Sequence, residues 1–305
     1  MLNPPLESLN DPEGDAVPEG LPPVMDAHVH VFPAPIFRSI WKWFDRYGWS
    51  VRYRLDADAV VSFLTSRGVD RVVALQYAHR PGIARELNRF MAALCRRHGG
   101  RVLGLGTVFP GEPGFEDIIR EIRDLGLRGV KLHAHVQCFD VDGPEMEAIY
   151  ALCSGLDLPV FLHGGKEPKS PAYACDPHLL CGARKVENIL RNFPTLRLLV
   201  PHFGMDEIAT FARLLEKYDN IWVDTAMTLA GYFPGQSPPN LATVRPERVM
   251  YGSDFPNLPY AWDRELKAIH GLNLPEDRLR MLLHRNAREL FSTDRPAKGG
   301  HDADL

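Results

Sequence analysis

Eight short apolar runs alternate with helical stripes along most of this 305-residue chain. Short apolar runs between turn residues are typical of buried parallel strands, and stripes with a period of about 3.6 residues are typical of amphipathic helices. Strands that alternate with helices predict an α/β fold, and eight such units predict a (β/α)8 TIM barrel of about 250 residues. The expected strands span residues 24–32, 71–77, 102–109, 129–133, 159–163, 196–202, 221–224 and 249–254.

The barrel pattern covers residues 24–291 and leaves a segment at each end. Residues 1–23 contain six prolines and several acids, so we expect a flexible arm, and we expect 292–305 to be a disordered tail. Residues 32–54 form an insertion after the first strand that is dense in aromatic side chains. These rings either wall a pocket or pack on one another as a small separate core.

Composition excludes several classes of function. A net charge of -4 without a Lys/Arg-rich run argues against nucleic-acid binding, and no apolar run approaches the roughly 18 residues of a membrane span. A nucleotide-binding doubly wound sheet is the weaker alternative fold, because no glycine-rich phosphate loop follows a strand. The N-terminus lacks the pattern of a signal peptide, and five cysteines without a C-x-x-C pair indicate reduced thiols in a cytoplasm. A structural zinc at Cys175, His178 and Cys181 is a minor alternative, because the spacing is irregular.

Polar residues gather where the expected strands end. Active sites of such barrels lie at the C-terminal ends of the strands, so we expect these side chains to meet. Each has an ordinary explanation when taken alone, as a hydrogen-bonded core histidine or a turn cap. Together they predict one site. They are His28 and His30 on the first strand, Lys131 and His133 on the fourth, His163 on the fifth, His202 on the sixth and Asp254 on the eighth.

The chemistry that these residue types favour is a divalent metal centre. A site of His28, His30, His163 and Asp254 has nitrogen and carboxylate ligands without a thiolate, which suits Zn²⁺ and also Mn²⁺, Fe²⁺ or Co²⁺. Such a site leaves a position for water, whose pKa a metal lowers from about 15.7 toward about 7. Asp254 is the candidate general base, and His202 can polarise the substrate or shuttle a proton.

Five motifs in this order resemble the amidohydrolase superfamily, specifically its amidohydrolase-related branch, over about residues 25–291. They are D-A-H-V-H, G-V-K-L-H, P-V-F-L-H-G, V-P-H-F-G and Y-G-S-D-F-P. The resemblance implies a TIM barrel with a divalent metal held by His28, His30, His163 and Asp254. It also implies that His202 is catalytic in a mononuclear enzyme or binds a second metal in a binuclear one. The branch includes lactonases, other C–O and C–N hydrolases, and decarboxylases similar to aminocarboxymuconate-semialdehyde decarboxylase.

The resemblance leaves the role of Lys131 open. In binuclear members a lysine on the fourth strand is carbamylated and bridges two metals, and Lys131 with His202 would complete that set. A plain lysine could instead pair with a substrate carboxylate, and we favour this single-metal interpretation. His133 shares a strand face with Lys131 and is expected to contact substrate. Further expected substrate-binding residues are Arg80, Lys166 and Trp41.

Three functions follow, in this order. The first is a metal-dependent hydrolase that attacks the carbonyl of a small, carboxylated lactone, ester or amide. The second is a non-oxidative decarboxylase that uses the same metal site. The motifs I-W-V-D-T and G-S-D-F-P slightly favour hydrolysis over decarboxylation. The third is a barrel that has lost catalysis and serves as a scaffold. The expected partner is a small molecule, and a homo-oligomer is compatible with the resemblance although no residue pattern indicates it.

Overall fold

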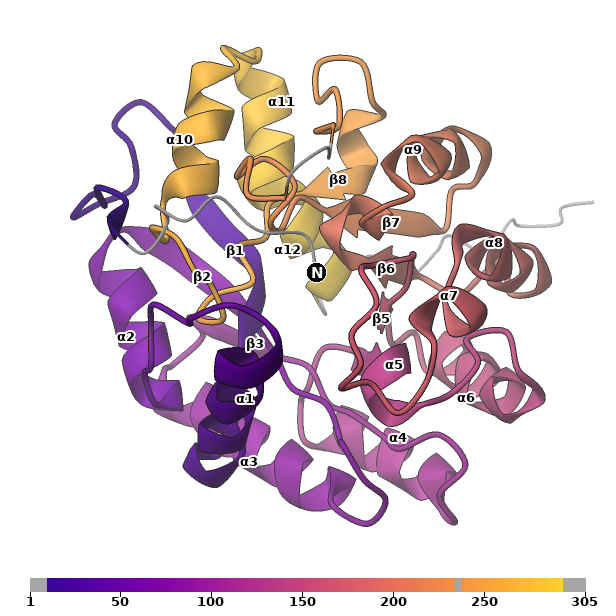
Figure 1. Ribbon diagram of the computed structural model, residues 1–305. Coiled ribbons are helices and arrows are strands. Elements are labelled where there is room, and N and C mark those ends of the chain that lie inside the picture. The colour runs from indigo at the N-terminus through magenta and orange to yellow at the C-terminus, as the bar shows by residue number, and fades with distance from the viewer. Residues whose placement is uncertain (1–9, 234–236, 293–305) are drawn as a thin grey trace, which may run out of the picture.

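The computed structural model describes residues 10–233 and 237–292, and within them the chain folds as the expected parallel (β/α)8 barrel (Figure 1). Figure 1 shows the strands ringed by helices. The strands are β1 (Val24–His30), β2 (Val69–Leu75), β3 (Val102–Gly104), β4 (Val130–His133), β5 (Val160–His163), β6 (Leu198–Val200), β7 (Ile221–Asp224) and β8 (Val249–Met250).

Two groups of paired strands, β1-β2-β3 and β4-β5-β6-β7-β8, make up the wall of the barrel. Isolated parallel bridges close the ring, from Gly106 to Val130 between β3 and β4, and from Val29 to Phe255 beyond β8. In the second closure the Asp254 N–H donates to the His28 carbonyl at 2.9 Å. This backbone contact places the side chains of residues 28 and 254 next to each other.

Several expected strands are longer than the observed ones, because the residues after each strand turn into loops or short helices. The α-helices are α1 (Ala34–Tyr47), α2 (Ala57–Ser66), α3 (Ala84–Arg97), α4 (Phe115–Asp124), α5 (Ala134–Gln137), α6 (Pro144–Gly155), α7 (Pro177–Leu180), α8 (Ala183–Asn192), α9 (Ile208–Lys217), α10 (Arg264–Gly271), α11 (Glu276–Arg280) and α12 (Asn286–Phe291). Short helical turns are η2 (Pro201–Gly204), η3 (Pro246–Arg248) and η4 (Met281–Arg285).

Two layers of apolar side chains hold the barrel together. One cluster includes Val73, Leu105, Phe161 and Leu199, and it is joined by Phe291 of α12. The larger cluster lies between the strands and the surrounding helices and takes up the apolar stripes of those helices. Burial of these side chains is the main force that stabilises the fold.

Residues 32–54, expected as a ring-rich insertion, fold mainly into α1. One face of α1 packs on the barrel, where Phe37 is fully buried and Trp41 stacks on its ring at 5.5 Å. Another face, with Trp43 and Phe44, lines a cavity. The expected pocket wall therefore occurs, whereas the buried rings join the main core of the barrel and do not form a separate one.

The expected N-terminal arm lies partly against the barrel. Residues 1–9 lie outside the described residues, but Gly14 donates its N–H to Asp263 at 2.8 Å and Val17 donates to the Arg67 carbonyl at 2.8 Å. We therefore describe residues 10–23 as a packed segment rather than a free arm. The expected tail from 293 onward lies outside the described residues.

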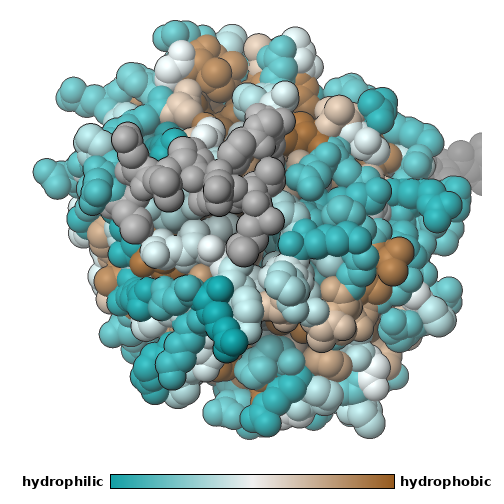
Figure 2. All heavy atoms as spheres, viewed as in Figure 1, coloured by the Kyte–Doolittle hydropathy of each residue, from teal (hydrophilic) through white to brown (hydrophobic). Residues whose placement is uncertain are grey.

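The face shown in Figure 2 is mainly hydrophilic, with small, separate hydrophobic patches. Across the described residues, Leu179 and Leu272 are the large hydrophobic side chains that are exposed. None of the described helices combines the length and the apolar character needed to cross a membrane. All five cysteines are free.

Candidate metal centre

The strand ends surround a cavity of about 270 Å³, which we call the catalytic cavity. Five of the residues expected at the site line it: His30, His133, His163, His202 and Asp254. Its other walls are rich in aromatic side chains from α1 and from the loops after α1, β2, β5 and β7, namely Trp43, Phe44, Tyr47, Trp49, Tyr77, Tyr173, Tyr232 and Phe233. A cavity with these walls suits a flat, unsaturated ligand.

Three donor atoms converge at one point of this region. His28 Nε2 lies 3.1 Å from His30 Nε2 and 3.1 Å from Asp254 Oδ1, and His30 Nε2 lies 2.9 Å from the same oxygen. The two imidazole rings are inclined at 62°, so nitrogen lone pairs in their ring planes can point at a common position. We call these three residues the first cluster.

Asp224 at the end of β7 fixes the orientation of His28. Its Oδ2 lies 2.8 Å from His28 Nδ1, and its Oδ1 accepts the backbone N–H of His202 at 2.8 Å. When Nδ1 donates to this carboxylate, Nε2 carries the lone pair that faces the first cluster. Histidine ligands of metals in proteins are commonly held by a carboxylate in this way.

The electrostatics of the first cluster favour a positive charge. Burial opposes charge on His28, but Asp224 and Asp254 raise the pKa of this imidazole to about 9. Burial lowers the pKa of His30 to about 4. Burial also disfavours the Asp254 carboxylate, yet hydrogen bonds from His28 and His30 hold its pKa well below the usual range. A bound cation would likewise be stabilised by the negative charges of Asp224 and Asp254.

The donor spacing fits a divalent metal ion. Ligands about 2.1 Å from a shared ion and at right angles to one another lie about 3.0 Å apart. The three measured separations of 2.9, 3.1 and 3.1 Å match that edge length. Two imidazoles and one carboxylate on a single face are a known ligand set for Fe²⁺ and related metals, and they also suit Zn²⁺ and Mn²⁺.

His202 lies beside the first cluster, in η2. Its ring centroid is 5.0 Å from that of His28 and 5.0 Å from that of His163, and its Nδ1 lies 3.0 Å from the Ala226 carbonyl oxygen. An Nδ1–H that donates to this carbonyl leaves Nε2 free to accept a proton. The backbone at His202 is left-handed, with φ 54°. Such backbone conformations are costly for residues with a side chain and are concentrated at functional sites.

Lys131 is fully buried, and its Nζ atom has no hydrogen-bond partner within the described part of the chain. The amine lies over the Phe161 ring, 4.1 Å from its centroid. Burial lowers its pKa to about 7, although the carboxylates of Asp224 and Asp254 act in the opposite direction. The lysine is therefore poised between its neutral and charged forms near neutral pH.

His163, expected as a metal ligand, belongs to a second group of histidines in this structure. Its Nε2 lies 3.0 Å from Glu167 Oε2, and His135 Nε2 lies 2.5 Å from the other oxygen of that carboxylate. Tyr173 donates its hydroxyl to Glu167 at 3.0 Å. With His133 these residues form what we call the second cluster.

The geometry of the second cluster differs from that of the first. His133 and His163 are partners in the register of β4 and β5, and their rings stack 4.0 Å apart at 11°. Lone pairs in these two nearly parallel ring planes cannot point at one ion. The His135 ring stands at 89° to the His163 ring, but these two imidazoles pair with different oxygens of Glu167. We therefore interpret the second cluster as a hydrogen-bonded network around Glu167, and the role of His163 as a metal ligand stays a prediction.

The other expected substrate contacts are dispersed. Arg80 is exposed and lines a neighbouring cavity, and the Lys166 N–H donates to Glu207 at 3.0 Å. Trp41 stacks on Phe37 on the face of α1 that packs on the barrel, whereas Trp43, two residues later in the same helix, lines the catalytic cavity. These three assignments stay predictions, and Trp43 is the α1 tryptophan that the cavity brings near the histidines.

Sequence reasoning missed four residues of the site: Asp224, His135, Glu167 and Tyr173. His135 could have been found, because H-A-H at 133–135 repeats the H-x-H spacing of 28–30. Asp224 ends an apolar strand, which was also a usable signal. Glu167 and Tyr173 lie in the loop after β5 and have no periodic pattern. The side chains of Cys175, Cys181 and His178 form hydrogen bonds to carbonyl oxygens of four different residues, His135, Gly165, Pro177 and Glu167.

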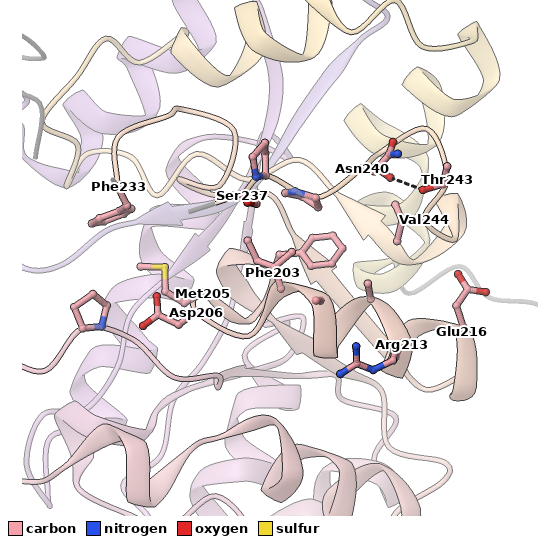
Figure 3. Close-up of a pocket in the computed structure, with 16 residues that line it drawn as sticks. Phe203, Met205, Asp206, Arg213, Glu216, Phe233, Ser237, Asn240, Thr243 and Val244 are labelled. Carbon is pink, nitrogen blue, oxygen red and sulfur yellow. Dashed lines mark hydrogen bonds between the residues drawn. The ribbon is translucent and has the colours of Figure 1, made fainter. Parts of the chain in front are cut away.

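A larger cavity of about 750 Å³ lies outside the barrel mouth, between α9 and the loop after β7. Figure 3 shows Met205 and Phe233 at one end of this outer cavity and Arg213 and Glu216 toward the other. Met205 and Phe233 also line the catalytic cavity. The described walls of the outer cavity contain neither a histidine nor a carboxylate of the first cluster, so its size does not make it the site of the chemistry.

Comparison with known proteins gives both sequence and structural matches. One relative is the decarboxylase orsB of Emericella nidulans, which is 23% identical over 327 residues, covering 88% of this chain and 97% of that protein. A 5-carboxyvanillate decarboxylase from Novosphingobium aromaticivorans, complexed with manganese and 4-hydroxy-3-methoxy-5-nitrobenzoic acid, has a TM-score of 0.63 and 16% identity, covering 92% of this chain and 99% of its own.

A proposed 2-pyrone-4,6-dicarboxylic acid hydrolase from Pseudomonas putida has a TM-score of 0.61 and 20% identity, with coverage of 88% and 97%. At these identities the structural matches establish the TIM-barrel fold. The family model described as Amidohydrolase matches residues 25–293, which is most of the chain. The ordered motifs, the barrel and this match agree, and the chain belongs to the amidohydrolase family.

Proposed function

We propose that this protein is a metal-dependent, non-oxidative decarboxylase of a small aromatic carboxylic acid. The observation that carries the proposal is the convergence of His28, His30 and Asp254 beside a cavity with aromatic walls. The decarboxylase orsB, which aligns with 88% of this chain, supports this choice of reaction. The strand-seven and strand-eight motifs slightly favour hydrolysis, whereas the relatives favour decarboxylation.

His28, His30 and Asp254 would hold the metal, and Asp224 would keep His28 in the binding orientation. The metal would supply a Lewis acid that anchors the substrate carboxylate and adjacent oxygen atoms. The aromatic walls would hold the ring in place and exclude water from it. Lys131 lies in the electrostatic field of Asp224 and Asp254, where its amine can offset negative charge on a bound acid.

The reaction requires one proton and releases one molecule of CO₂. The bond between the ring carbon and the carboxylate carbon breaks, and its electron pair stays on the ring carbon, which takes the proton. His202 is our candidate for the residue that delivers it. Its Nδ1 is held by the Ala226 carbonyl, so its Nε2 is the atom that accepts and returns a proton.

The test is an assay of the protein loaded with Mn²⁺ or Zn²⁺, using 2,6-dihydroxybenzoate and 5-carboxyvanillate as acids and 2-pyrone-4,6-dicarboxylate as a lactone. We expect CO₂ release and, in D₂O, one deuterium at the carbon that lost the carboxylate. His202→Asn should lower kcat about 10²- to 10⁴-fold, the usual contribution of a general acid or base. His270→Asn, an exposed histidine on α10, is the matched control and should keep wild-type activity.

Two outcomes would contradict the proposal. Ring opening of the lactone without CO₂ release from either acid would identify a hydrolase, the function ranked first from sequence. If the metal-loaded protein turns over neither the acids nor the lactone, both the decarboxylase and the hydrolase functions are contradicted, and the scaffold alternative is favoured.

A further inference from the structure

A second cavity of about 640 Å³ lies directly beside the catalytic cavity, and we call it the lateral cavity. The two cavities share six lining residues, so they are neighbouring compartments of one cleft. The shared residues are Trp43, Phe44, Tyr77, His133, His135 and Tyr173. Any ligand that fills the catalytic cavity touches the same side chains that border the lateral one.

The lateral cavity is walled by aliphatic side chains from two helices. Ile36 and Ile40 come from α1, whereas Ile83 and Leu87 come from the start of α3. The charged lining residues Arg80 and Glu86 are exposed, which places them at the rim. The compartment is therefore apolar inside and charged at its opening.

The sequence of α1 is what creates this surface. Ile36, Ile40, Trp43 and Phe44 follow one another at helical spacing and share a face. These four residues line the lateral cavity, and Ile36 and Ile40 also pack against the edge of the core, while Phe37 on another face is fully buried. Apolar side chains facing a water-filled space gain free energy when a ligand replaces the water.

The border between the two cavities is aromatic. Trp43 of α1 stacks on Tyr173 at 5.5 Å, and Tyr77 packs edge-on against His133 at 4.7 Å. The Tyr173 hydroxyl is tied to Glu167 at 3.0 Å, which anchors this border to the second cluster. The rings can contact a substituent that extends from an aromatic acid in the catalytic cavity.

The catalytic cavity, at about 270 Å³, has room for a single ring with small substituents, and the lateral cavity more than doubles the space available. We propose that the lateral cavity binds an apolar substituent of the substrate, an alkyl chain of several carbons carried by the aromatic acid. The inference rests on the proposed decarboxylase function, because it assigns the head of that substrate to the catalytic cavity.

The test is a series of 2-hydroxybenzoates with methyl, propyl or pentyl chains at ring position 4, 5 or 6. We expect kcat/KM to rise about two- to fourfold for each added methylene at one of these positions, the gain typical of burying a CH₂ group. Isothermal titration with the corresponding alkylphenols, which lack the carboxylate, measures the same dependence on chain length without any chemistry.

Two substitutions that fill the lateral cavity, Ile40→Trp and Ile83→Trp, should flatten the dependence on chain length in both measurements. Ile208→Trp places the same bulk in the outer cavity of Figure 3 and is the matched control, which should keep the dependence. Thermal melting of each variant checks that it folds. With two positions on different helices, the test does not depend on one variant being stable.

The outcomes separate this inference from the proposed function. Alkylphenols that bind more tightly with length, and lose that gain in both filled variants, would support the lateral site even if no acid is decarboxylated. Decarboxylation with no dependence on chain length would overturn the lateral site and leave the proposed function standing. If the dependence on chain length survives in both filled variants, the lateral site is also overturned. If that dependence is lost in Ile208→Trp, the alkyl chain binds in the outer cavity.

Discussion

The two histidine clusters at the barrel mouth are built from the same residue types but differ in the angle between the two rings that the strands carry. In the first cluster, the His28 and His30 rings meet at 62° and their Nε2 atoms lie 3.1 Å apart. In the second, His133 and His163 stack at 11°, and the His135 ring of α5 stands at 89° to that of His163. Because nitrogen lone pairs lie in the ring plane, the first pair can point at one ion and the second cannot. The strand-borne rings of the first cluster therefore suit a single ion, whereas in the second cluster Glu167 pairs with His135 and His163 through different oxygen atoms.

The backbone explains this difference. His28 and His30 lie on one strand, and the chain after β8 brings Asp254 to them through a backbone hydrogen bond to His28. His133 and His163 lie at the same register position of neighbouring parallel strands, where side chains run side by side and planar rings stack. Neighbouring parallel strands therefore favour stacking, whereas an H-x-H pair on one strand favours convergence.

The largest expected effect is on metal content. His28→Ala or Asp254→Asn should reduce bound metal from about one equivalent to near zero, because each removes one of three converging ligands. His135→Ala, the matched change in the second cluster, should leave about one equivalent. Inductively coupled plasma mass spectrometry on gel-filtered protein measures both. Loss of metal in His135→Ala would show that the second cluster also binds the ion, and the two clusters would then no longer differ in function.

Asp224→Asn should have the next largest effect. This substitution keeps the shape of the side chain but removes the charge that holds His28 Nδ1 at 2.8 Å. Loss of such a partner typically weakens metal binding about 10- to 100-fold. Competition with a chelator of known affinity gives the change in Kd. An unchanged Kd would mean that the strand positions alone orient His28.

The sequence predicted the barrel and the strand-end positions, because both depend on local periodicity. It also predicted His28, His30 and Asp254, which the barrel closure brings together. It could not show that His163 would face Glu167, since that contact comes from an irregular loop whose path has no periodic signal. It also could not show whether Trp41 or Trp43 faces the catalytic cavity, because that depends on the rotation of α1 about its axis.

Lys131 interacts electrostatically with a carboxylate of each cluster, Asp254 and Glu167, and Lys131→Met tests the charge of its amine in the metal-free protein. The folded-state pKa of about 7 is below the ordinary 10.5, so the buried charge destabilises the fold fully below about pH 7 and less as the pH rises toward 10.5. Methionine should therefore raise the free energy of unfolding at pH 6 by a few kcal/mol, about 5 at most. The gain should shrink toward pH 10.

Urea unfolding at several pH values measures the effect of Lys131→Met. Lys42→Met, on the exposed side of α1, is the control and should change little. The same pair of variants tests the binuclear alternative in the metal-loaded protein. A fall from two metal equivalents to one in Lys131→Met alone would indicate a carbamylated, bridging lysine and contradict the single-metal interpretation.

The smallest expected effect comes from Glu167→Gln, at the centre of the second cluster. Burial opposes the charge of this carboxylate, but His135 and His163 hold its pKa well below the ordinary 4.5. The group therefore stabilises the fold above about pH 4.5, and that contribution is lost as the pH falls through the depressed pKa. Replacing it should cost about 1–3 kcal/mol at pH 7, the usual cost of weakening buried charge-assisted hydrogen bonds.

Because Glu167 belongs to a network and not to the first cluster, Glu167→Gln should keep its metal while its melting temperature falls. Glu147→Gln, an exposed glutamate on α6, provides the baseline for the loss of one surface charge. The difference in stability between wild type and Glu167→Gln should narrow as the pH falls below about 4.5. A variant that loses metal and keeps its stability would make Glu167 a ligand, and the ring angle would then no longer separate the two clusters.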